Sequence, residues 1–315
     1  MCTLSANTLH LGAERAATRV LPLHTGGVEH TITNNGLTLW CEDFGDPTDP
    51  AVLLVMGHGG QGTAWPDSFC EALAAGGRRV VRFDNRDTGL SDSVDFAASP
   101  YTVGDLAADA LAVLDALGIE CAHVVGLSMG GMIGQEMAIE HPERVLSLTS
   151  WMSTPDVLDP ATFDWKSLPV RHAKVTEFVA RTAACPPATR AERVEAGVGL
   201  IRVCAGSATK LDEVATRSWV EAGLDRSEKD GSLNHSLAIS RSRERFDLLP
   251  GLSLPTLVLH GTDDGVIPFA HGEQTARLIP GARFVPLPGV GHEIPMAQED
   301  FLVHVLLTHT CASAA

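Results

Sequence analysis

The segment Gly126-Leu127-Ser128-Met129-Gly130 joins the end of a short apolar run, residues 123–127, to a following segment with helical spacing. A serine in this pattern at a strand-to-helix junction is typical of a nucleophile held on a sharp turn. Glycines two residues before and after the serine leave space where a Cβ would collide with the neighbouring turn. A helix that begins at Met129 adds free N–H groups and a positive dipole end. The pattern predicts that Ser128 is a nucleophile, against the alternative of a glycine-rich turn with an incidental serine.

A nucleophilic serine needs a histidine as base and a carboxylate that orients the histidine, and in this arrangement both follow the serine. The apolar run 256–260 is followed by Asp263 and Asp264, and the run 283–287 by Pro288-Gly289-Val290-Gly291-His292. Of 13 histidines, His292 alone lies in a glycine-rich loop between the expected last strand and last helix. We therefore predict His292 as the base. Either aspartate fits as the acid. Only one of the two can face His292, because adjacent side chains point in opposite directions.

Hydrolysis through a tetrahedral intermediate also needs two N–H groups that face its oxyanion. One is expected from Met129, which follows the nucleophile. The other is expected from the glycine-rich loop 57–62, where backbone can approach the substrate closely. The N–H of His58 is favoured, with Gly59 one position away. A flexible glycine turn without this role is the alternative.

Apolar runs alternate with helical patterns along the chain, which predicts a mostly parallel sheet covered by helices. Residues 30–33 and 37–42, joined by Asn34-Asn35-Gly36, are expected to form an antiparallel hairpin. The expected parallel strands are 51–56, 79–84, 123–127, 145–151, 256–260 and 283–287. The expected helices are 65–75, 102–117, 129–141, 271–278 and 298–307.

Residues 153–251 interrupt this alternation with helical patterns and no convincing strand, which predicts an inserted helical cap. The expected organisation is an N-terminal arm over 1–27, a core over 28–152 and 252–315, and the cap over 153–251. Four cap aromatics form either an apolar lid over a bulky substrate or the interior of the cap: Phe163, Trp165, Phe178 and Trp219. Among the residues expected to contact substrate are Gly59, Trp165 and Trp219.

The net charge of -16 disfavours nucleic acid and anionic lipid surfaces as partners. No apolar stretch approaches the length of a membrane span, and residues 1–27 lack the pattern of a secretory signal, so a cytoplasmic protein is expected. Seven cysteines without a Cys-x-x-Cys pair do not predict a disulfide framework. No phosphate-binding loop, cofactor or metal is implied, and the oligomeric state is left open.

These motifs resemble the α/β-hydrolase superfamily over residues 36–309, and within it the aclacinomycin methylesterase group of bacterial esterases. The resemblance is carried by segments 54–57, 63–67, 82–89, 124–130 and 289–292. It places the acid at Asp264. It is weaker in the cap, and the loop has His58 where the methylesterase has glycine. Arg86 and Asp87 lie in a family-like loop, and we expect them to form a structural ion pair.

The resemblance implies hydrolysis of a carboxylic ester, and in its narrowest form of a methyl ester on a bulky, apolar, polyketide-like molecule. A carbon–carbon hydrolase, a lactonase or a perhydrolase would use the same triad. Epoxide hydrolases and haloalkane dehalogenases are disfavoured, because they have aspartate at the position of Ser128. A non-hydrolytic cyclase and a ligand receptor on the same fold are alternatives of another class.

Overall fold

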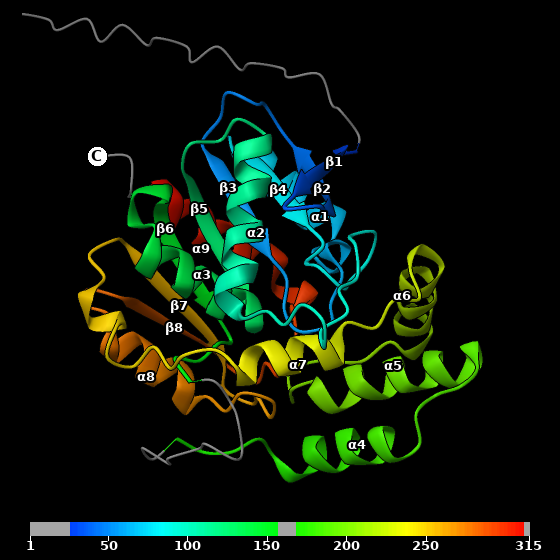
Figure 1. Ribbon diagram of the computed structural model, residues 1–315. Coiled ribbons are helices and arrows are strands. Elements are labelled where there is room, and N and C mark those ends of the chain that lie inside the picture. Colours follow the sequence, from blue (N-terminus) through cyan, green and yellow to red (C-terminus); the bar gives the residue numbers. More distant parts are fainter. Residues whose placement is uncertain (1–25, 157–167, 312–315) are drawn as a thin grey trace, which may run out of the picture.

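The computed structural model describes residues 26–156 and 168–311 (Figure 1). Within them, strands β1 to β8 form one sheet in the order β1-β2-β4-β3-β5-β6-β7-β8. Their bounds are β1 Val28–Asn34, β2 Leu37–Phe44, β3 Ala51–Val55, β4 Arg79–Phe83, β5 Ala122–Leu127, β6 Val145–Trp151, β7 Thr256–Gly261 and β8 Arg283–Leu287. The fold predicted from the sequence is confirmed.

The sheet begins with the expected hairpin and continues in parallel. Strands β1 and β2 pair antiparallel, and Asn35 and Gly36 between them both have positive φ angles, of 49° and 84°. This is the conformation for which Asn-Gly is favoured in a two-residue hairpin turn. Strand β2 runs antiparallel to β4, and strands β3 to β8 are parallel to one another. The carboxyl ends of six strands therefore meet at one edge of the sheet.

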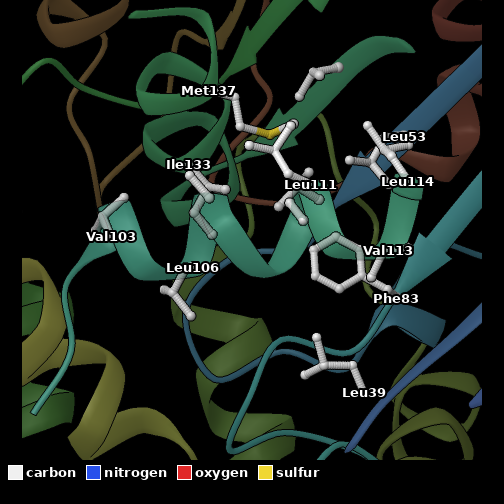
Figure 2. Close-up of a cluster of buried hydrophobic side chains, with 14 of the residues drawn as sticks. Leu39, Leu53, Phe83, Val103, Leu106, Leu111, Val113, Leu114, Ile133 and Met137 are labelled. Atoms are coloured by element: carbon white, nitrogen blue, oxygen red, sulfur yellow. The ribbon is translucent and has the colours of Figure 1, made fainter. Parts of the chain in front are cut away.

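Helices pack on both faces of the sheet. Their bounds outside residues 153–251 are α1 Asp67–Ala75, α2 Val103–Ala116, α3 Met129–Glu140, α8 Ala270–Leu278 and α9 Glu299–Cys311. In β3, Leu53 and Val55 pack with α2 and α3, whereas Val52 and Leu54 pack with α1 and α9. This follows from the alternation of side chains along a strand. Figure 2 shows the first of these clusters, with Leu53 and Phe83 against α2.

Helix α1 begins later than its sequence pattern suggests. The expected helix starts at Trp65, but Trp65 and Pro66 are extended and α1 begins at Asp67. The ring of Pro66 disfavours helical geometry at the preceding residue, so the helix cannot include Trp65. The Trp65 side chain is instead fully buried beside Phe69 and Trp151.

In the described part of the chain between β6 and β7 lie four α-helices, and Figure 1 shows them together at one end of the sheet. They are α4 Ala173–Ala184, α5 Arg190–Cys204, α6 Glu213–Arg226 and α7 Ser232–Ser240. We call them the inserted helices. Helices α5 and α6 share a small apolar core made by Val194, Val198 and Val220. The described part of 153–251 thus contains helices and no strand, while most of the expected arm over 1–27 lies outside the described residues.

Candidate active site

Ser128 lies at the turn between β5 and α3 in a strained conformation. Its φ and ψ angles are 58° and −119°, a combination that costs a non-glycine residue on the order of 1–3 kcal/mol. Its N–H donates to Trp151 O at 2.8 Å, and the Ser153 hydroxyl donates to Ser128 O at 2.7 Å. A Cβ on Gly126 would collide with Gly130 O, which is the steric reason for glycine in this turn.

A hydrogen-bonded chain joins Ser128 to His292 and Asp264. Nε2 of His292 lies 3.0 Å from Ser128 Oγ, and Nδ1 lies 2.7 Å from Asp264 Oδ2. An ionised carboxylate can only accept, so Nδ1 of His292 donates to Asp264 and Nε2 is free to accept the serine proton. The three side chains come from the carboxyl ends of β5, β7 and β8, which the parallel sheet brings to one edge.

The Asp264 carboxylate is buried but fully hydrogen-bonded. Its Oδ1 accepts from Val266 N at 2.8 Å and Ile267 N at 2.9 Å. Burial acts to raise the pKa of Asp264, but the charge of His292 and hydrogen bonds from His260 and His292 together lower the pKa well below its usual range. Asp264 therefore remains ionised beside His292.

Asp263, the rival acid, has hydrogen-bond partners other than His292. Its Oδ2 accepts from Ser207 N at 3.0 Å, and Oδ1 accepts from the Thr262 hydroxyl at 3.2 Å. These hydrogen bonds, chiefly those from Ser207, lower the pKa of the half-buried carboxyl. Asp263 thus holds a loop that follows α5.

The glycine-rich loop lies directly against the serine. A Cβ on Gly57 would be 3.0 Å from both Leu127 O and Ser128 Cβ. The N–H of Gly59 donates to Nδ1 of His235 at 2.9 Å. Within the described residues, the N–H groups of His58 and Met129 have no hydrogen-bond acceptor. Of the two N–H groups considered in this loop, that of His58 is therefore the one still available.

The imidazole of His58 reaches toward the inserted helices. Its Nε2 lies 2.8 Å from Ser236 Oγ on α7, and its ring lies 6.0 Å from that of His235. Although His58 is accessible to solvent, the surrounding protein desolvates the imidazole and, with His235, lowers its pKa to about 4. The side chain is therefore neutral at pH 7, and it presents a polar group that the sequence patterns did not indicate.

The end of α5 and the loop 205–209 that follows it contact the loop that carries His292. The N–H of His292 donates to Cys204 O at 2.8 Å, and Ala208 N donates to Gly289 O at 2.8 Å. The Glu293 carboxylate accepts from Gly206 N at 3.1 Å and from the Thr209 hydroxyl. Sequence patterns gave no signal for Glu293, because these two partners lie 87 and 84 residues away.

The predicted substrate-contacting aromatics have different environments. Trp219 on α6 is 53% exposed, whereas Phe178 on α4 is buried against α5. Phe178 therefore belongs to the interior of the insertion. Phe163 and Trp165 lie outside the described residues.

The expected ion pair between Arg86 and Asp87 is wrong. The Arg86 guanidinium instead makes two hydrogen bonds to Asp109 on α2, at 2.6 and 2.7 Å. Asp87 accepts from Val94 N at 2.6 Å and from the Tyr101 hydroxyl at 2.5 Å. Arg86 and Asp87 lie in a turn in which Asp87 has a positive φ angle of 72°, and each side chain has a separate partner.

Comparisons with known proteins place the chain in a family. The model of a family described as alpha/beta hydrolase fold matches residues 50–297. Rhodomycin D methylesterase DnrP of Streptomyces peucetius is 36% identical over 296 residues, which cover 90% of this chain and 98% of DnrP. The putative non-heme bromoperoxidase BpoC of Mycobacterium tuberculosis is 29% identical over 79% of this chain and 87% of its own length.

Two solved structures illustrate the similarity in fold. A thermophilic esterase from Thermogutta terrifontis has a TM-score of 0.69 and 25% identity, covering 92% of this chain and 99% of its own. The esterase EaEST from Exiguobacterium antarcticum has a TM-score of 0.72 at 22% identity, covering 88% and 96%, and supports the fold alone.

The chain belongs to the α/β-hydrolase family. Its similarity to the methylesterases confirms the predicted resemblance and supports an enzyme that hydrolyses carboxylic esters. No helix in the described parts of the chain is long and apolar enough to cross a membrane.

Proposed function

We propose that the protein hydrolyses a carboxylic ester through an acyl-enzyme, with Ser128 as nucleophile, His292 as general base and Asp264 as the orienting acid. The observation that carries this proposal is the continuous chain of hydrogen bonds, 3.0 Å from Ser128 to His292 and 2.7 Å from His292 to Asp264. Serine and base are within the distance needed for proton transfer.

The reaction follows from these positions. Ser128 Oγ attacks the ester carbonyl carbon while Nε2 of His292 takes the serine proton, and the ionised Asp264 stabilises the cationic imidazole. The N–H groups of His58 and Met129 stabilise the negative oxygen of the tetrahedral intermediate. His292 then protonates the leaving alcohol. Water, deprotonated by His292, attacks the acyl-enzyme and releases the carboxylic acid and Ser128.

For the substrate, we propose a methyl ester on a bulky, mostly apolar, polyketide-like molecule. The proposal is supported by similarity to rhodomycin D methylesterases over nearly the whole of both chains. Exposed apolar side chains also occur on the inserted helices, among them Trp219 and Leu237. In this proposal the helices α4–α7 form the cap and Trp219 contacts the substrate, as does the backbone around Gly59.

Replacing Ser128 by alanine tests the mechanism. The S128A variant should lose ester turnover by at least about a thousandfold, because no other nucleophile is held against His292. A fluorophosphonate probe should label the native protein at Ser128, as located by peptide mass analysis, and should not label S128A. A near-native melting temperature of the variant would show that the fold is kept. Turnover retained by folded S128A would refute the mechanism.

A further inference from the structure

The loop that carries His58 is a tight turn with a central peptide that can rotate. Gly60 N donates to Gly57 O at 3.2 Å, which closes a four-residue turn. Gly59, at its third position, has a φ angle of 67°, whereas that of His58 is not positive. These signs define a type II turn. Rotation of the peptide between His58 and Gly59 converts such a turn to type I, because the two types differ in the orientation of that peptide.

One side chain holds this peptide. Nδ1 of His235, on α7, accepts from Gly59 N at 2.9 Å, and Nε2 lies 2.9 Å from Arg86 O. Since a backbone N–H can only donate, Nδ1 is unprotonated and Nε2 carries the proton that is donated to Arg86 O. The His235 side chain is fully buried, and burial lowers its pKa, which keeps the ring neutral.

The other end of this bridge is fixed to the core independently of α7. Arg86, whose carbonyl accepts from His235, forms two hydrogen bonds with the fully buried Asp109 on α2. His235 thus connects the central peptide of the turn to a part of the core that is anchored through Asp109. Ser232, at the start of α7, also lies close to this turn, because a Cβ on Gly59 would be 2.5 Å from Ser232 Oγ.

We propose that His235 is a positioning residue that holds the turn 57–60, so that the N–H of His58 stays directed at the oxyanion. This inference rests on the proposed function, since it presumes a tetrahedral intermediate on Ser128. Rotation of the held peptide would change the ψ angle of His58 and loosen the position of its N–H. A misplacement of about 1 Å in such a group can reduce the rate about 100-fold.

The test compares two replacements of His235 in the full-length protein. In H235N, Oδ1 occupies the position of Nδ1 and can accept from Gly59 N. In H235L, no acceptor remains. We expect kcat for a p-nitrophenyl ester to fall about 10- to 100-fold in H235L, with KM changed less than threefold, and to recover to within about threefold of wild type in H235N. N234L is the matched control, because it removes another hydrogen bond of α7, from Asn234 Nδ2 to Val94 O, without touching the turn.

A second readout reports on the oxyanion directly. A trifluoromethyl ketone forms a tetrahedral adduct with the serine, so its inhibition constant should rise in H235L by the same factor as kcat/KM falls, and should stay near wild type in N234L. If H235L does not fold, H235Q replaces it, because the longer side chain places its amide at the Nε2 position. Equal kcat values in H235N and the variant without an acceptor would overturn the inference. Loss of turnover in S128A alongside that result would leave the proposed function intact, whereas active S128A would remove both.

Discussion

At the scale of single residues, adjacent positions have very different surroundings. Asp264 is buried, accepts from two backbone N–H groups and faces His292, whereas the half-buried Asp263 accepts from Ser207 at the other side of the loop. The backbone hydrogen bonds fix the Asp264 carboxylate before any substrate arrives. The two residues can therefore be separated by experiment, although their side chains are chemically identical.

Replacing Asp264 by asparagine should lower kcat by about a thousandfold to ten-thousandfold. An asparagine amide can donate to Nδ1 of His292, which would favour the tautomer with its proton on Nε2, where the serine proton must be accepted. Steady-state kinetics with a p-nitrophenyl ester would measure the loss. D263N, which changes the same chemical group one residue away, should retain kcat within about threefold. A larger loss in D263N than in D264N would contradict the assignment of the acid.

The sequence allowed Ser128 and His292 to be predicted because each follows a recognisable strand in a glycine-rich segment. The choice between His58 and Gly59 as oxyanion donor could not be settled in this way. It depends on His235, which lies 176 residues from Gly59 and contacts it only in the folded chain. Arg86 was assigned the wrong partner for a similar reason, since Asp109 lies on a helix later in the chain.

At the scale of elements, the sheet could be predicted more fully than its connections. Short apolar runs and turn residues locate strands locally, and an Asn-Gly pair fixes the hairpin between β1 and β2. The packing of α7 on the glycine-rich loop depends on side chains such as His235 and Ser236, which appear in no local pattern. A helical insertion is therefore visible in sequence, whereas the loops that it contacts are not.

Strand β5 contains a titratable group that should make stability depend on pH. His123 is buried with Nδ1 2.8 Å from Ser147 Oγ, and its pKa is lowered to about 4 by burial, with Arg78 and His309 adding to this effect. The folded pKa lies below the unfolded value of about 6.5, so the unfolded chain binds the proton first. The stabilisation is complete above pH 6.5 and is lost as the pH falls toward 4.

Replacing His123 by asparagine should make the unfolding free energy less sensitive to acid. Between pH 7 and 4, wild type should lose up to about 3 kcal/mol more than H123N, as measured by urea denaturation. S147A is the control: it removes the same hydrogen bond but keeps the buried imidazole, so its loss should remain close to that of wild type. Parallel pH curves for wild type and H123N would show that His123 does not contribute.

At the scale of the whole molecule, similarity to methylesterases extends over 90% of the chain and includes the inserted helices. The enzyme should therefore prefer a methyl ester on a polycyclic polyketide over p-nitrophenyl acetate when kcat/KM is corrected for the reactivity of the leaving group. Methanol release, quantified by an alcohol oxidase assay, provides the measurement, with S128A as the blank. Turnover of the small activated ester without methanol from the large one would indicate a general esterase and exclude the proposed substrate.

The insertion touches four loops of the core: His235 contacts the turn 57–60, Asn234 contacts Val94, Ser207 contacts Asp263, and loop 205–209 contacts Glu293. Exchange of this segment between relatives would carry away partners of all four. We expect a chimaera to inherit the chemistry only if residues on both sides of each boundary are transferred together. Evolution of substrate range in this chain is therefore expected to proceed by substitution within the insertion rather than by its replacement as a module.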